Sequence, residues 1–243
     1  MASRWPSAVK RNLRMLLSDQ LLGAIDYVRF PDLDATSGGP LNGQARRQAL
    51  FHALIECVNP LAIVETGTFR GTTTEFMADA GLPVFSVERI PRYFGFARLR
   101  LWRRRNVTLL CGDSRNALRS WFDGPLRSMA LRTIFFYLDA HWHENLPLAE
   151  ELDLVFGRCR NAVVMVDDFQ VLHDNGYGYD NYGPGKALTP DYIKELIAMH
   201  GLCAFYPATP SNEEGGARRG FVILTRKEVH GEKLASLSLL RSA

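Results

Sequence analysis

The stretch from Ala62 to Thr74, AIVETGTFRGTTT, constrains the fold of this chain more than any other part of the sequence. Apolar residues lead into the carboxylate of Glu65, and a turn with Gly67 and Gly71 follows before a helical pattern begins. This pattern predicts a buried strand, a glycine-bearing loop and the N-terminus of a helix. Glycine lets backbone approach a ligand without an interfering Cβ atom. The loop also carries hydroxyls, on Thr66, Thr68 and Thr72. We therefore expect a small polar ligand over this turn.

The composition restricts the class of protein. A chain of 243 residues that is 47% hydrophobic can bury the core of one α/β domain. The net charge of +3 gives no global nucleic-acid footprint. The four cysteines are scattered without a C-x-x-C pair, which argues against a disulfide framework or a zinc site. No apolar run approaches the ~20 residues of a membrane span, and signal-peptide features are missing. We expect a cytoplasmic protein.

The chain divides into three predicted parts: an N-terminal helical extension and linker at 1–43, a main domain at 44–226 and a C-terminal tail at 227–243. Ser7 to Val28 has a basic amphipathic helical pattern. Such a segment packs on its own domain, on the partner in a homodimer or across the active site, and we favour these alternatives over a membrane surface. The tail is expected to be peripheral.

Acidic residues follow the next two predicted strands. The strand at 83–87 ends in Glu88, and an acid at the end of the second strand is the group that accepts hydrogen bonds from a ribose diol. The strand at 107–111 is followed by Asp113 and Ser114. These two residues are candidates for ligand binding, but an Asp-Ser pair at this place is also typical of a simple helix N-cap. Seven arginines lie between Glu88 and Asp113. They suit the solvated face of a helix better than a contact with RNA or an anionic substrate.

Three more carboxylates follow the fourth and fifth strands. Asp139 ends the strand at 133–138, and the pair Asp167-Asp168 ends the strand at 162–166. Neighbouring parallel strands would bring these acids together at one edge of the sheet. Clustered carboxylates raise one another's pKa unless a cation binds between them. Carboxylate oxygens are suitable ligands for Mg²⁺ in the first place, and for Mn²⁺ or Ca²⁺ as alternatives. The sequence therefore predicts a divalent metal held by Asp139, Asp167 and Asp168.

From Leu61 to Gln170 the chain resembles class I S-adenosylmethionine (SAM) dependent methyltransferases, at the level of motifs. The E-x-G-x-x-x-G loop carries the first likeness, and YLDAHW with VVMVDDFQ extends it to metal-dependent O-methyltransferases of the catechol and macrocin or sugar type. The resemblance implies SAM binding by residues of the loop and the strand ends: Glu65, Thr66, Gly67, Thr68, Phe69, Gly71, Thr72, Glu88, Arg89, Asp113, Ser114 and Asp139.

The resemblance also implies a fold. It is a doubly wound, Rossmann-like α/β/α sandwich with a seven-stranded, mostly parallel sheet. The strands at 202–206 and 220–225 match its closing hairpin, and the seventh strand runs antiparallel.

The predicted reaction is methyl transfer from SAM to a hydroxyl of a small molecule, such as a sugar, a polyol or a catechol-like ring. A metal would lower the pKa of the attacking hydroxyl, and a nearby base would take the proton. Related families place that base just after the fourth strand, where His141 and His143 lie. Neutral imidazole suits this task. We favour His141 and keep His143 second.

Three other functions stay open. The protein could be a metal-independent methyltransferase in which Asp139 serves the cofactor, or a SAM-binding protein without catalysis. A nicotinamide dehydrogenase ranks last, because the third glycine of its fingerprint is missing and Glu65 is a poor neighbour for a pyrophosphate.

Two further segments complete the picture. After Pro147 a helix with an apolar stripe is expected to leave Glu150, Glu151 and Asp153 in solvent. The long segment at 171–190 contains Tyr177, Tyr179 and Tyr182 and is a candidate lid over the acceptor.

Overall fold

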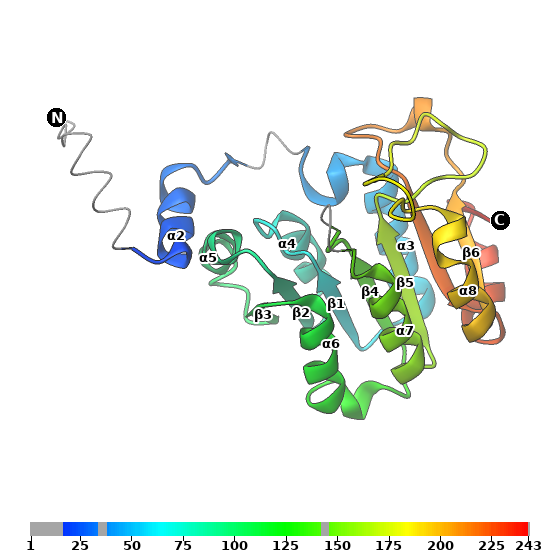
Figure 1. Cartoon of the computed structure of the whole chain (residues 1–243), viewed down its shortest axis with the longest axis horizontal. Coiled ribbons are helices and arrows are strands. Elements are labelled where there is room, and N and C mark those ends of the chain that lie inside the picture. The colour runs from blue at the N-terminus through cyan, green and yellow to red at the C-terminus, as the bar shows by residue number, and fades with distance from the viewer. Residues whose placement is uncertain (1–16, 34–37, 142–145, 243) are drawn as a thin grey trace.

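The computed structural model of the protein describes residues 17–33, 38–141 and 146–242. These residues form one sheet of eight strands in the order β3-β2-β1-β4-β5-β7-β6-β8, with helices on both faces (Figure 1). The strands are β1 Ala62–Thr66, β2 Val84–Glu88, β3 Val107–Cys111, β4 Ile134–Leu138, β5 Ala162–Asp167, β6 Leu202–Pro207, β7 Phe221–Arg226 and β8 Leu240–Ser242.

The strand directions confirm the predicted fold class. Strands β1 to β5 pair in parallel, and β7 lies antiparallel between β5 and β6. The predicted seven strands are present, but the sheet has an eighth. Strand β8 pairs antiparallel with β6, so the C-terminal tail forms an edge of the sheet and is not merely peripheral. This strand was not predicted, because three residues are too few to show a strand pattern.

The two faces of the sheet form separate cores because side chains alternate along each strand. Val64 and Phe136 pack toward one face, while Ile63 and Phe135 pack toward the other. Helices α6 Ser114–Asp123, α7 Leu148–Arg158 and α8 Pro190–His200 cover the first face. Helices α3 Ala45–Val58, α4 Thr72–Ala78 and α9 Glu232–Ala235 cover the second. Both faces of the sheet are therefore buried under helices, which explains why its strands are almost continuously apolar.

The N-terminal helix α2 Asp19–Arg29 packs on α5 Pro91–Arg100, beside the β3 edge of the sheet (Figure 1). The two helices approach closely because each presents a glycine at the crossing. A Cβ atom on Gly23 would lie 1.8 Å from the carbonyl oxygen of Arg92. Helix α2 begins after Ser18, whose side chain caps it by accepting a hydrogen bond from the backbone N–H of Leu21. The predicted amphipathic segment begins at Ser7. Residues 1–16 lie outside the described ranges.

Short helical turns connect the main elements. They are η2 Pro40–Gly43, η3 Arg127–Met129, η4 Ser211–Glu213 and the π-helical turn η5 Lys227–Gly231. Within the described ranges, every helix is too short or too polar to cross a membrane.

Candidate functional site

The five parallel strands end at one edge of the sheet, and this edge carries the predicted site residues. In the pairing register Leu138 lies between Thr66 and Val166. Asp139 and Asp167, the next residues, therefore end adjacent strands. The parallel topology thus brings the predicted residues to one edge of the sheet, as the strand pattern predicted.

The loop after β1 adopts a conformation that requires glycine at two positions. Gly67 has φ of +89°, and a Cβ atom there would lie 2.3 Å from the carbonyl oxygen of Asp139. Gly71 has φ of +82° and precedes helix α4. A Cβ atom on Gly71 would meet the side chain of Leu101 at 3.1 Å. The first glycine thus lets two strand ends approach each other, and the second lets α4 start beside α5.

Glu65 lies beneath this loop. Its carboxylate accepts hydrogen bonds from the hydroxyls of Thr74 and Ser86. The hydroxyls of Ser86 and Thr68 are 2.6 Å apart, which links the carboxylate to the loop above it. Burial raises the pKa of Glu65 to about 7. Glu65 therefore supports the loop from within the protein.

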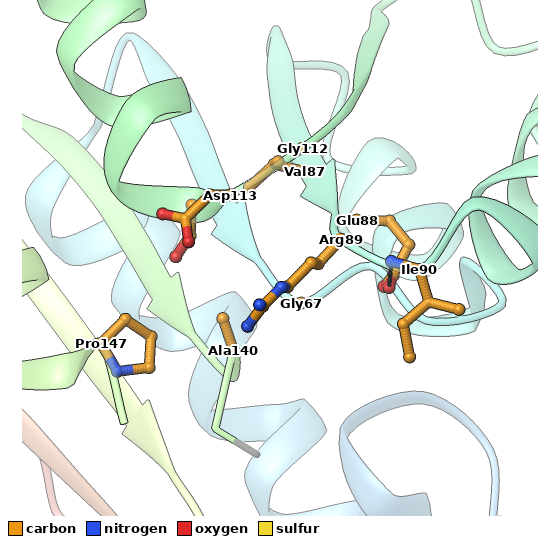
Figure 2. A pocket seen from close by; sticks show the side chains of 10 residues that line it. Gly67, Val87, Glu88, Arg89, Ile90, Gly112, Asp113, Ala140 and Pro147 are labelled. Carbon is orange, nitrogen blue, oxygen red and sulfur yellow. Dashed lines mark hydrogen bonds between the residues drawn. The ribbon is translucent and has the colours of Figure 1, made fainter. Parts of the chain in front are cut away.

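A cavity of about 210 Å³ opens beside the loop at the ends of β1, β2 and β3. Figure 2 shows side chains and glycines from different strand ends around it. Its lining residues are Gly67, Val87, Glu88, Arg89, Ile90, Gly112, Asp113, Ser114, Ala140 and Pro147. Five of the predicted cofactor-binding residues are thus brought to one cavity: Gly67, Glu88, Arg89, Asp113 and Ser114.

Two acids of this cavity are held in place by nearby donors. The carboxylate of Glu88 accepts hydrogen bonds from the backbone N–H groups of Phe69, at 2.6 Å, and Ile90, at 2.7 Å. Burial nevertheless raises the pKa of Glu88. Asp113 caps helix α6 and forms an ion pair with Arg115 at 2.7 Å, and this pairing lowers the pKa of Asp113. Both side chains are therefore oriented before any ligand arrives.

Two further cavities adjoin the first, because Gly67 lines all three. One of about 340 Å³ is lined by Gly67, Phe69, Glu88, Tyr93, Asp139, His141, Asp168, Asp180 and Tyr182, and we call it the acceptor-side cavity. A smaller one of about 90 Å³ is lined by Gly39, Asn42, Gly67, Thr68, Phe69, Thr72, Thr73, Tyr137, Asp139 and Asp167. Of the predicted cofactor residues, Glu65, Thr66 and Gly71 line none of these three cavities.

The predicted metal ligands after β5 make contacts of a different kind. Asp167 is buried and forms an ion pair with the buried guanidinium of Arg47 on α3. Asp168 forms an ion pair with Arg219 at 2.5 Å, and Arg219 also pairs with Asp180. Within the described ranges, no cluster of three or more acids, histidines or cysteines is arranged to hold a metal ion. The prediction of a magnesium site is therefore not supported.

Asp139 and His141 lie together in the acceptor-side cavity. Burial raises the pKa of Asp139 well above its usual value, and the charges of Asp167 and Asp168 act in the same direction. Burial lowers the pKa of His141 to about 4, so its imidazole is neutral near pH 7. Neither ring nitrogen has a hydrogen-bond partner of good geometry. The other predicted base, His143, lies outside the described residues.

Three residues of this edge were missed or misjudged from the sequence. Arg47 was not singled out from the sequence, yet it lies in the buried stripe that α3 forms with Leu50 and Leu54. That i, i+3, i+7 spacing is a signal that could have revealed it. Glu151 was expected in solvent and is fully buried. Arg219 had no signal, because it follows a polar, glycine-rich loop.

The segment at 171–190, the candidate lid, contributes residues to this edge, and we call it the acceptor loop. Asp180 and Tyr182 line the acceptor-side cavity. Tyr177 instead is buried, and its hydroxyl donates to the carbonyl of Thr209 at 2.9 Å. The loop is therefore bound to the body of the protein and contributes one of the three tyrosines to the cavity.

Solved structures share this architecture. The O-methyltransferase TomG from Streptomyces achromogenes, involved in tomaymycin synthesis and solved with SAM, is 19% identical with a TM-score of 0.57, covering 90% of this chain and 96% of that chain. An O-methyltransferase from Bacillus cereus, solved with SAH, is 16% identical with a TM-score of 0.57, covering 90% and 97%. No protein-family model and no curated protein matches the chain. The chain therefore has the class I methyltransferase fold that the sequence predicted.

Proposed function

We propose that the protein is a SAM-dependent O-methyltransferase that acts on a hydroxyl of a small molecule, such as a sugar, a polyol or a catechol-like ring. The observation that carries this proposal is the pair of adjoining cavities that share Gly67 and Glu88. One has the strand-end acids that suit an adenosyl group, and the other holds a buried, neutral imidazole. Two solved O-methyltransferases with this fold contain SAM or SAH.

In this proposal the first cavity holds the adenosine of SAM. A carboxylate has about four acceptor sites. The carboxylate of Glu88 accepts from the backbone N–H groups of Phe69 and Ile90, so acceptor sites remain for the ribose diol. Asp113 would accept a hydrogen bond from the adenine amino group. The methionine end would enter the smaller cavity, where Thr68 and Thr72 supply hydroxyls.

The acceptor would enter the acceptor-side cavity, next to the sulfonium. Its hydroxyl oxygen attacks the methyl carbon, the carbon–sulfur bond breaks, and its electron pair stays on sulfur as neutral S-adenosylhomocysteine. The proton of the hydroxyl passes to a ring nitrogen of His141, which is neutral and has no competing hydrogen-bond partner of good geometry. Adjoining cavities that hold the two reactants in line would supply a large part of the catalysis.

The metal dependence predicted from the sequence does not fit the residues at this edge. A divalent ion requires several oxygen ligands that are free to coordinate it. The carboxylates of Asp167 and Asp168 are instead paired with guanidinium groups. In the proposed reaction the acceptor hydroxyl therefore loses its proton to His141 without a metal ion.

Calorimetry with SAH and with NAD tests the cofactor. We expect SAH to bind and NAD not to bind. Loss of the charged hydrogen-bond acceptor in Glu88→Gln should weaken SAH binding by about 10- to 100-fold. The matched control is Glu56→Gln, on the exposed side of α3, and it should bind SAH like the wild type. Binding of NAD without SAH would refute the proposal.

A labelled-methyl transfer screen over sugars, polyols and catechols tests the activity. With an acceptor in hand, His141→Asn should lower kcat by about 10²- to 10⁴-fold, because the proton acceptor is lost, while SAH affinity stays near the wild-type value. If SAH binds and no acceptor is ever labelled, the result favours a SAM-binding protein without catalysis.

A further inference from the structure

We infer that the guanidinium groups of Arg47 and Arg219 occupy the place that the sequence assigned to a divalent cation, and that this edge of the sheet is built to exclude a metal. The acids after β5 are thereby neutralised by the chain itself. Arg219 also joins the acceptor loop to the strand ends through its ion pairs with Asp180 and Asp168. This inference does not depend on the proposed reaction.

The first observation in support is that the carboxylate of Asp167 already accepts as many hydrogen bonds as it can. One carboxylate oxygen accepts from the guanidinium of Arg47 and from the backbone N–H of Asp168, at 2.7 Å for the latter. The other accepts from the side-chain amide of Asn42, at 2.9 Å, and from the hydroxyl of Tyr137. A carboxylate offers about four lone-pair sites, so these four donors leave none for a metal ion.

The second support is the arrangement around Arg219. Its Nε donates to Asp168 at 2.5 Å, and one of its terminal nitrogens donates to Asp180 on the acceptor loop. The second oxygen of Asp180 accepts from the hydroxyl of Tyr182. Arg219 therefore bridges two carboxylates that both line the acceptor-side cavity. A planar guanidinium with fixed donor directions suits such a bridge better than a spherical ion that needs six or more ligands.

The two arginines are also linked to each other. A terminal nitrogen of Arg47 donates to the backbone carbonyl of Arg219, and the backbone N–H of Arg219 donates to the side chain of Gln44 at 2.8 Å. Two guanidinium groups thus sit beside three carboxylates, those of Asp167, Asp168 and Asp180. Because both cations are part of the chain, the local charge does not depend on a metal in solution.

Mn²⁺ binding tests this inference without any acceptor or cofactor. Free and bound Mn²⁺ are counted by electron paramagnetic resonance on the full chain. The wild type should bind no stoichiometric Mn²⁺. Arg219→Gln should bind at least about tenfold more tightly than the wild type, because it releases Asp168 and Asp180 beside Asp139 in one cavity. Arg219→Lys keeps a cation there and should stay close to the wild type.

The matched control is Arg104→Gln. Arg104 also bridges two carboxylates, those of Glu75 and Asp79, but on the surface between α4 and α5. The Arg104→Gln variant also loses one guanidinium charge, but it should gain no Mn²⁺ site. Circular dichroism establishes that each variant is folded.

Three outcomes would overturn the inference. One is stoichiometric Mn²⁺ binding by the wild-type chain, which needs no variant to fold. Another is a folded Arg219→Gln protein that binds no Mn²⁺, because the guanidinium would then not be what keeps the metal out. The third is equal Mn²⁺ binding by Arg219→Gln and Arg219→Lys. Binding of SAH is measured separately, so failure of this inference is distinct from failure of the proposed function.

Discussion

The acidic residues at the carboxyl ends of the parallel strands have opposite environments in the two halves of this sheet edge. At the ends of β2 and β3, Glu88 and Asp113 line an open cavity, and each is oriented in part by a donor two residues further along the chain, Ile90 and Arg115. At the end of β5, Asp167 and Asp168 are paired with arginines from α3 and from the residues before β7. The same position in the topology therefore lines an open cavity in one half and forms internal ion pairs in the other.

This difference teaches that a strand-end acid is not by itself a ligand. A carboxylate at the end of a parallel strand is delivered to the edge by topology, but its partners decide whether its lone pairs remain available. Four predictions test this contrast, in order of decreasing expected effect.

The largest effect is expected for Arg47→Met. The substitution leaves the carboxylate of Asp167 buried without its cation, which should lower the free energy of unfolding by about 3–5 kcal/mol. Urea unfolding measures this loss. Adding Asp167→Asn in the same chain should restore much of the stability, because the unpaired buried charge is then gone. A single variant as stable as the wild type would contradict the buried-pair interpretation.

Glu151 tests a third way of handling a buried acid, which is protonation. Burial raises its pKa from 4.5 to about 7. Since the folded-state value is the higher one, its contribution is complete below pH 4.5 and is lost as the pH rises to 7. Glu151→Gln should therefore gain about 3 kcal/mol relative to the wild type between pH 4.5 and pH 8.

Urea unfolding at several pH values measures this difference. Glu65, whose pKa is also raised to about 7, contributes equally to both proteins and cancels. The neighbouring Glu150 is exposed, so Glu150→Gln is the control and should follow the pH dependence of the wild type. A parallel pH dependence of Glu151→Gln and wild type would contradict the assignment.

Gly67→Ala tests the junction between the two halves. The new Cβ atom would force apart the ends of β1 and β4, in a backbone conformation that L side chains rarely adopt. Gly81→Ala is the matched control, because Gly81 has φ of +75° and open space around its Cβ position. We expect Gly67→Ala to be less stable than this control by about 2 kcal/mol in urea unfolding, and to bind SAH more weakly. Equal stability of the two variants would argue against a tight junction.

The smallest effect is expected for chelation. If arginines supply the positive charge beside Asp167 and Asp168, EDTA or added Mg²⁺ should leave the SAH affinity unchanged within a factor of about two. Calorimetry in the two buffers measures this. A large loss of affinity in EDTA would restore the metal site that the sequence suggested.

Much of the fold could be read from the sequence because its signals are local. Apolar runs ending in Glu65, Glu88 and Asp139 mark the strands, and Gly67 and Gly71 mark the loop, so the parallel order followed. The structure then placed five of the predicted cofactor residues around one cavity. Short or irregular elements escaped, such as the edge strand β8, whose three residues carry no period.

The acids were harder to interpret, because a charge looks the same in sequence whether it meets solvent, a metal or an arginine. Glu151 was predicted to be in solvent, although it lies on the buried side of α7. Glu150 and Asp153 beside it in sequence are acidic and exposed, and this masked the position of Glu151 on the buried side. Arg47 was passed over for the same reason, beside Arg46.

The architecture and the edge at which chemistry can occur follow from strand patterns a few residues long, so they can be predicted from the sequence. Which carboxylates stay available depends on contacts that exist only in the folded chain. Arg47 is separated from Asp167 by 120 positions, and Arg219 from Asp168 by 51. Such pairs form only when the fold brings distant side chains into a space where an unpaired charge is costly, and no local pattern encodes that meeting.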